Sequence, residues 1–142
     1  MKLLRKREEQ KESRFGEFVE ILRTKFDRHG TGYLFGSRAR GEASYVSDFD
    51  VLCIGDVSQD RTSLRLWASE YSVDLFVIAR SLLDKELEDM NTLLLDALTE
   101  GRVLFDDLGI HQDIKKRVES FARSRNIVRT PQGWYSRGMI ND

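Results

Sequence analysis

The sequence is poor in cysteine and proline, since its 142 residues hold one of each, Cys53 and Pro131. A single cysteine cannot form an internal disulfide bond, which excludes a disulfide-stabilised fold and agrees with a reducing, cytoplasmic location. No apolar run approaches the roughly 18 residues that a membrane span requires, and even Val73–Ala79 is interrupted by a charge. The charged start, Met1–Arg7, lacks the apolar core of a signal peptide. We therefore expect neither secretion nor a membrane span.

The chain also lacks a strong charge of one sign, because 23 basic and 24 acidic residues leave a net charge of −1. The strongly basic character of a dedicated duplex-DNA-binding protein is absent. The charges are nonetheless unevenly placed: residues 84–107 hold two basic and eight acidic side chains, whereas residues 111–142 hold seven basic and three acidic ones. Blocks of this kind form a solvated surface or dock a partner of opposite charge, and the sequence leaves both readings open.

Hydrophobic periodicity predicts helices alternating with strands in one α/β domain. Apolar stripes at helical spacing predict helices around 15–26, 62–71, 82–98 and 110–122. Short apolar runs predict strands at 33–35, 47–55, 73–78 and 103–105. The pattern dissolves from Asn126 onward, where Trp134 and Tyr135 either pack on the body or anchor a partner. We therefore expect a single domain over residues 1–125, with a catalytic core at about 15–105, and an irregular tail over 126–142.

Three aspartates interrupt otherwise apolar strands. Asp48 and Asp50 are two residues apart, so their side chains leave the same face of a strand, and Asp74 lies within the next apolar strand. Carboxylates are rarely buried unless they are paired or bind a metal, and two on one face repel each other. A divalent cation such as Mg²⁺, which takes oxygen ligands, resolves this repulsion. The alternative is that these aspartates face solvent at one end of the sheet or pair with a nearby arginine.

A second motif precedes the aspartates, where Gly36 and Ser37 follow a predicted strand and open a short helix. Free backbone N–H groups at such a helix start bind phosphate, glycine allows close approach, and the serine hydroxyl adds a donor. Taken alone, this turn is better explained as an ordinary helix N-cap. Together with Asp48 and Asp50, the spacing Gly-Ser-x10-Asp-x-Asp indicates a site for a metal ion and a triphosphate.

These motifs, Gly36–Gly41 followed by Ser47–Asp50, resemble the signature of the polymerase-β-like nucleotidyltransferase superfamily. The resemblance spans roughly Phe15 to Phe105 and is closest to the minimal nucleotidyltransferases, single-domain proteins often encoded beside a HEPN-domain protein. It implies a small mixed β-sheet flanked by helices, and one or two Mg²⁺ ions held by the first two aspartates with Asp74 completing the triad. For HEPN-paired members it also implies an antitoxin that transfers AMP from ATP to a tyrosine of the toxin.

The expected reaction assigns each residue a role. Asp48 and Asp50 hold Mg²⁺ against the triphosphate of ATP, whose β- and γ-phosphates bind Gly36 and Ser37. Asp74 binds the metal near the attacking hydroxyl and accepts its proton. Catalysis then consists mainly of positioning and charge neutralisation.

Two arginines of the motif, Arg38 and Arg40, have two interpretations. Either they bind the nucleotide and steady the pyrophosphate leaving group, or they form a salt bridge with Glu42 or another acidic neighbour. The sequence does not decide between the two.

The partner and the acceptor follow from the length of the chain. A catalytic core over residues 15–105 leaves no room for a domain that holds nucleic acid, so nucleic acid is not expected as the direct substrate. A HEPN-domain protein encoded nearby is the expected partner, and a homo-oligomer is left open. The alternatives are a non-enzymatic binding module that neutralises a partner by complex formation, or a nucleotidyltransferase that acts on a small molecule.

Overall fold

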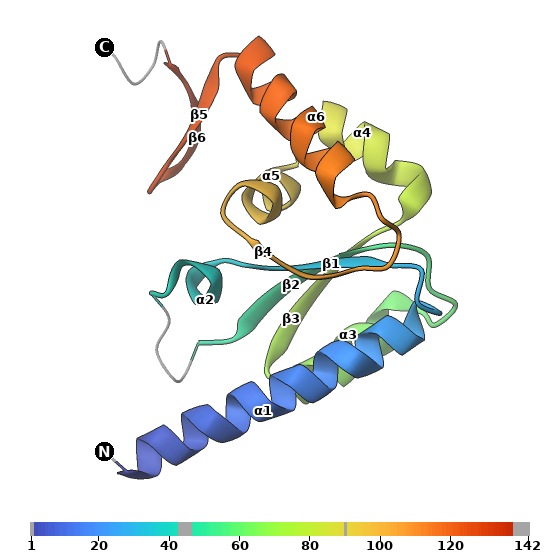
Figure 1. Ribbon diagram of the computed structural model, residues 1–142, viewed down its shortest axis with the longest axis vertical. Coiled ribbons are helices and arrows are strands. Elements are labelled where there is room, and N and C mark those ends of the chain that lie inside the picture. The colour runs from blue at the N-terminus through green and yellow to red at the C-terminus, as the bar shows by residue number, and fades with distance from the viewer. Residues whose placement is uncertain (1, 43–46, 90, 138–142) are drawn as a thin grey trace.

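The computed structural model describes residues 2–42, 47–89 and 91–137 and has one mixed sheet at its centre (Figure 1). Four strands lie in the order β3-β2-β1-β4. They are β1 (Thr31–Phe35), β2 (Phe49–Ile54), β3 (Val73–Ile78) and β4 (Arg102–Asp106). The β2–β3 pair is parallel, whereas β1 is antiparallel to both of its neighbours. The mixed sheet expected from the sequence is confirmed.

One face of the sheet is covered by α1 (Lys2–Lys25) and α3 (Arg61–Ser69), which lie below it in Figure 1. The aromatic stripe of α1 packs on β2, where the Phe15 and Phe49 rings stack with centroids 4.1 Å apart. Leu64 of α3 and Cys53 of β2 are both fully buried in this layer. Burial raises the pKa of the Cys53 thiol, so this cysteine is a small core residue in the thiol form.

The opposite face is covered by α4 (Leu83–Glu88), α5 (Thr92–Thr99) and α6 (His111–Ser124), with a short 3₁₀ turn, η1 (Arg80–Leu82), before them. The core of this layer joins the sheet to the three helices. Its fully buried members include Leu52 of β2, Leu94 of α5 and Ile114 of α6. The sheet is therefore the middle layer of a three-layer structure, and only its ends and edges reach solvent.

The single helix expected over 82–98 is wrong, because α4 and α5 are separate helices. Asn91 begins the second one: its side-chain oxygen accepts hydrogen bonds from the backbone N–H groups of Leu93, at 2.9 Å, and Leu94, at 3.3 Å. Asparagine competes for backbone donors in this way and favours a helix start over a helix interior. Met90, which the helical period included, lies outside the described residues.

The irregular tail expected after Asn126 is also wrong, because β5 (Ile127–Thr130) and β6 (Gly133–Ser136) pair as an antiparallel hairpin. Pro131 and Gln132 form its two-residue turn. Proline presets the backbone for the first corner of a turn, and the Thr130 hydroxyl accepts the Gln132 N–H at 3.2 Å. Strands of four residues are too short to give a clear alternation of apolar and polar side chains.

The hairpin packs on the body of the protein through α5. Asp96 Oδ1 accepts a hydrogen bond from Trp134 Nε1 at 2.8 Å and another from Arg129 Nε at 2.8 Å. Trp134 is half-buried against the core under α5 and α6, whereas Tyr135 is 36% exposed. Of the two roles left open for this pair, Trp134 therefore takes the packing role.

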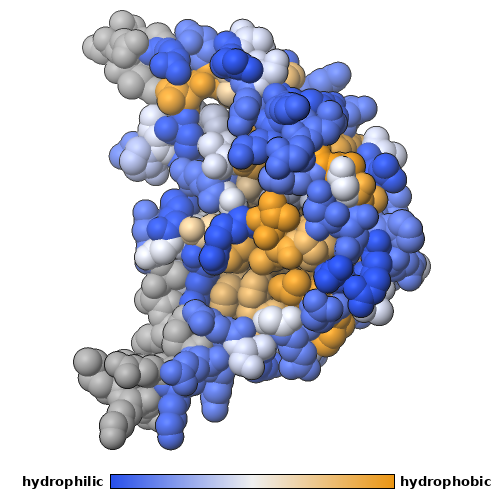
Figure 2. Space-filling view, viewed as in Figure 1, coloured by the Kyte–Doolittle hydropathy of each residue, from blue (hydrophilic) through white to orange (hydrophobic). Residues whose placement is uncertain are grey.

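The strand β4 forms one edge of the sheet and carries an exposed apolar side chain, since Val103 is 41% exposed. In the view of Figure 1, hydrophobic residues gather across the middle of the surface and hydrophilic residues surround them (Figure 2). An edge of this kind is open to a further strand.

Within the described part of the chain, no helix has the length and the apolar character that crossing a membrane would require.

Candidate active site

The candidate site lies where β1 ends and α2 (Ser37–Arg40) begins. Gly36 makes the turn between them with φ 75° and ψ −157°, a conformation that residues with a side chain rarely adopt. As a glycine, the N-cap residue Gly36 has no side chain with which to cap the start of this single helical turn. Free N–H groups at a glycine turn are suited to phosphate oxygens.

Two carboxylates lie beside this turn on neighbouring strands. Asp50 of β2 is the register partner of Phe35 at the end of β1 on one side and of Asp74 of β3 on the other. A Cβ atom added to Gly36 would overlap the carboxylate of Asp50. The absence of a side chain at position 36 therefore creates the space that the Asp50 carboxylate occupies. The two motifs found in the sequence meet in the structure.

The three predicted aspartates are less buried than expected. Asp50 is half-buried, while Asp74 and Asp48 are exposed, and Asp48 precedes the first residue of β2. The prediction of three buried carboxylates is corrected for Asp48 and Asp74: both face solvent at the end of the sheet, as the alternative reading held. The physical reason in β3 is the alternation of side chains: Val73 and Leu75 belong to the core that α1 and α3 cover, so Asp74 between them lies on the opposite face of the strand.

Electrostatics nonetheless couples the three carboxylates. The pKa of Asp50 is raised by burial first, and then by the negative charges of Asp74 and Asp48, with Arg40 opposing. Asp48 and Asp74 also line a common cavity of about 230 Å³. Within the described ranges, however, no group of three carboxylate, histidine or cysteine side chains is close enough to hold a metal ion. Asp50 and Asp74 are brought together, and Asp48 lies near them without closing a ligand set.

The two arginines of the motif make different contacts. Arg40 pairs with Glu42 at 3.1 Å and with Glu100, the C-cap residue of α5, at 3.4 Å, so of the two interpretations the salt bridge is the one observed for Arg40. Arg38 donates to the Ser47 carbonyl at 2.9 Å, and its guanidinium lies 4.4 Å from the Phe49 ring centroid. Arg38 therefore positions the segment that leads into β2.

Two basic residues near the site escaped the sequence reasoning. Lys11 of α1 donates to the Ser47 carbonyl at 2.7 Å, and Arg65 of α3 lines the same cavity as Asp48 and Asp74. Both lie on the polar faces of amphipathic helices, where a lysine or arginine is usually only solvated. Nothing in the spacing of either residue distinguishes it from its charged neighbours.

Solved structures of similar fold include chains of toxin–antitoxin structures. A chain of a toxin–antitoxin structure with AMP-PNP gives a TM-score of 0.54 at 20% identity, covering 75% of this chain and 85% of that one. A chain of the Shewanella oneidensis complex of tri-AMPylated HEPN toxin with MNT antitoxin gives 0.52 at 16%, covering 80% and 87%. A chain of the MntA–HepT toxin–antitoxin gives 0.51 at 16%, also covering 80% and 87%. At these identities the likeness establishes the fold.

The sequence itself identifies the class. Residues 16–125 match the nucleotidyltransferase domain family, while no curated protein sequence matches the chain. Because the match covers most of the 142 residues, the chain belongs to the nucleotidyltransferase domain family. It is a nucleotidyltransferase, and the resemblance drawn from Gly36–Gly41 and Ser47–Asp50 is confirmed.

Proposed function

We propose that the chain is a Mg²⁺-dependent adenylyltransferase that moves AMP from ATP to a tyrosine hydroxyl of a HEPN-domain toxin, and so acts as the antitoxin of a cytoplasmic pair. The observation that carries the chemistry is the placement of Asp50 and Asp74 on adjacent strands against the Gly36–Ser37 turn. The acceptor is supported by the fold neighbours, one of which contains an AMPylated HEPN toxin beside an MNT antitoxin.

The donor set fits a hard divalent cation. Asp50 and Asp74 supply carboxylate oxygens, and Mg²⁺ commonly takes one or two carboxylates together with phosphate oxygens. The pKa of Asp50 is raised first by burial and then by the negative charges of Asp74 and Asp48, and a cation would relieve the repulsion among the carboxylates. One or two Mg²⁺ ions bound by Asp48, Asp50 and Asp74 would neutralise triphosphate charge during the transfer.

The protein's own residues bind the phosphates of ATP, orient the reacting groups and accept the proton of the attacking hydroxyl. The Gly36–Ser37 turn binds the β- and γ-phosphates through backbone N–H groups and the Ser37 hydroxyl, and Arg38 and Arg40 flank it. The tyrosine oxygen attacks the α-phosphorus, the bond from that phosphorus to the bridging oxygen breaks, and pyrophosphate leaves. Asp74 is exposed at the start of β3, where it meets an incoming hydroxyl and accepts its proton. The single domain over residues 1–125 carries this site.

Labelled ATP tests this function directly. The chain is incubated with α-³²P-ATP, Mg²⁺ and a HEPN-domain protein encoded beside it, and the label is traced to a residue by mass spectrometry. We expect one label per acceptor tyrosine. Asp74→Asn should reduce transfer at least 100-fold while ATP affinity changes little, and Asp113→Asn on α6, outside the site, should leave transfer unchanged.

The alternatives give different results in the same experiment. A stable complex that forms without transfer in the presence of Mg²⁺ and ATP would identify a non-enzymatic binding module. Release of pyrophosphate only when a small hydroxyl compound is added would identify a small-molecule nucleotidyltransferase. Equal transfer by the wild type and by Asp74→Asn would refute the role of this carboxylate.

A further inference from the structure

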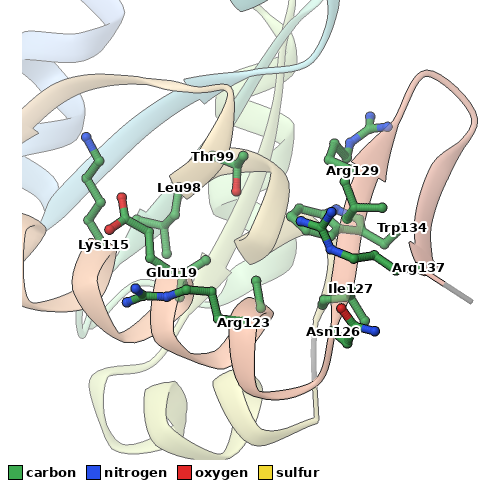
Figure 3. Close-up of a pocket in the computed structure, with 13 residues that line it drawn as sticks. Leu98, Thr99, Lys115, Glu119, Arg123, Asn126, Ile127, Arg129, Trp134 and Arg137 are labelled. Carbon is green, nitrogen blue, oxygen red and sulfur yellow. The ribbon is translucent and has the colours of Figure 1, made fainter.

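A second cavity, separate from the candidate active site, lies between α5, α6 and the C-terminal hairpin (Figure 3). Its volume is about 680 Å³, within the roughly 300–1,000 Å³ that is typical of binding sites. Side chains of α6 and of the hairpin face each other across it, with Leu98 and Thr99 of α5 behind. None of the residues assigned to nucleotide transfer lines this cavity.

The floor of the cavity is apolar and preformed. Leu98, Val118 and Trp134 line it, and the first two are buried in the core beneath α5 and α6. Trp134 is held in place by its hydrogen bond to Asp96. A wall that is already ordered avoids much of the entropic cost of binding, so an apolar side chain can enter without rearrangement of the hairpin.

The rim of the cavity is positively charged. Lys115 and Arg123 lie along α6, Arg137 follows β6, and Glu119 is the one carboxylate among the lining residues. Within the part of the chain that the structure describes, Lys115, Arg123 and Arg137 have no ion-pair partner. These three cations lie on both walls of the groove, an arrangement that fits an extended anionic chain better than a single compact anion.

We propose that this groove binds an acidic segment of the partner protein, with an apolar side chain against Trp134 and carboxylates beside Lys115, Arg123 and Arg137. The inference rests on the proposed protein partner and adds the surface that holds it. Nucleic acid fits less well, because the floor is apolar and the whole chain has a net charge of −1. The charged rim speeds and orients association, while the apolar floor supplies the buried anchor.

Matched charge reversals on one helix test the proposal. Lys115→Glu/Arg123→Glu reverses two rim cations, whereas Lys116→Glu/Arg125→Glu makes the same change in net charge at exposed positions outside the groove. Binding of the HEPN-domain protein is measured by calorimetry on the full chain. The rim variant should bind at least tenfold more weakly and the control within about threefold of the wild type. Both should keep the wild-type melting temperature and Mg²⁺-ATP affinity.

A third variant separates shape from charge. Ala122→Trp fills the groove without altering any charge, and it should weaken binding at least tenfold as well. Equal weakening by the rim variant and its control would reduce the effect to overall charge and overturn the proposal. Wild-type affinity in the rim variant or in Ala122→Trp would also overturn it, as would a wild-type chain that does not bind the HEPN-domain protein.

Two further readouts keep the inference distinct from the proposed chemistry. Asp50→Asn should bind the partner like the wild type, because its carboxylate is outside the groove. Loss of binding in the rim variant without AMP transfer by any protein would support the groove and refute the chemistry. The affinity for a fluorescein-labelled 20-nucleotide RNA is measured as well. If the rim variant loses this affinity while its affinity for the partner is unchanged, the groove binds nucleic acid instead.

Discussion

The substitution Gly36→Ala tests the contact on which the candidate site depends. At φ 75° and ψ −157°, the backbone occupies a region that is essentially restricted to glycine and costs other residues about 1–3 kcal/mol. The added Cβ would also lie 3.2 Å from Asp50 Cγ and closer still to Oδ2. Since the backbone of β1 is fixed by strands on both sides, we expect the Asp50 carboxylate to move.

A second glycine supplies the matched control. Gly41 ends α2 with almost the same φ, 74°, in the left-handed region, and a Cβ there would meet nothing within 4 Å. Gly41→Ala therefore carries backbone strain of about 1–2 kcal/mol without touching a carboxylate. Comparison of the two variants separates strain in the backbone from displacement of Asp50.

The expected results differ in kind. For a domain of this size, 1 kcal/mol lowers the melting temperature by roughly 3–4 °C, so both alanine variants should melt several degrees below the wild type. Only Gly36→Ala should lose Mg²⁺-dependent ATP binding and reduce AMP transfer at least 100-fold. Wild-type transfer by Gly36→Ala, or an equal loss in Gly41→Ala, would refute the argument that position 36 makes room for the Asp50 carboxylate.

Three further perturbations have defined outcomes. Burial and the charges of Asp74 and Asp48 raise the pKa of Asp50, so its ionised form destabilises the metal-free fold. Asp50→Asn should therefore raise the free energy of unfolding at pH 7 in EDTA. In urea denaturation, the difference in stability between this variant and the wild type should shrink as the pH falls through the raised pKa. Trp134→Ala should cost about 2 kcal/mol, roughly half of a core Trp→Ala change, whereas Tyr135→Ala should cost under about 0.5 kcal/mol in the same denaturation assay. Cys53, buried with a raised pKa, should react with iodoacetamide only after unfolding, as mass spectrometry can measure.

Two strands were predictable because their signals are local and strong. The run at 33–35 is apolar and ends at Gly36, the run at 73–78 is apolar apart from Asp74, and the structure places β1 and β3 there. The turn at Gly36 could be singled out only together with Asp48 and Asp50, because glycine followed by serine after an apolar strand is also an ordinary helix start. Asp50 and Asp74 could be grouped in advance only through the family resemblance, which made Asp74 the third carboxylate; their parallel register comes from the structure.

The missed features depend on contacts that a sequence period does not contain. The break between α4 and α5 results from the side chain of Asn91 capping a helix in the middle of an unbroken apolar stripe. The C-terminal hairpin is held by Asp96, more than 30 residues earlier in the chain. The exposure of Asp74 reflects its position between Val73 and Leu75, whose side chains occupy the core on the other face of the sheet. The Asn91 cap is a local hydrogen bond that competes with the apolar period, whereas the other two features are set by tertiary packing.

One helix connects the phosphate-binding turn to the hairpin. Asp96 and Glu100 are four residues apart on α5 and its C-cap, so they lie on one face of the helix. Asp96 holds Trp134 and Arg129 of the hairpin. Glu100 lies 3.9 Å from Arg129 Nη2 and 3.4 Å from Arg40 Nη1 on α2. Carboxylates of α5 are thus shared between the hairpin and the turn.

This arrangement has a consequence for the carboxylates of the site. Arg40 lowers the pKa of Asp50 and opposes the effects of burial and of the other two aspartates. Arg40 is in turn held by Glu100, whose charge is shared with Arg129 of β5. Partly exposed pairs of this kind each contribute little stability. Their importance is positional. Through Glu100, they connect Arg129 in the wall of the proposed docking groove to Arg40, the arginine that lowers the pKa of Asp50.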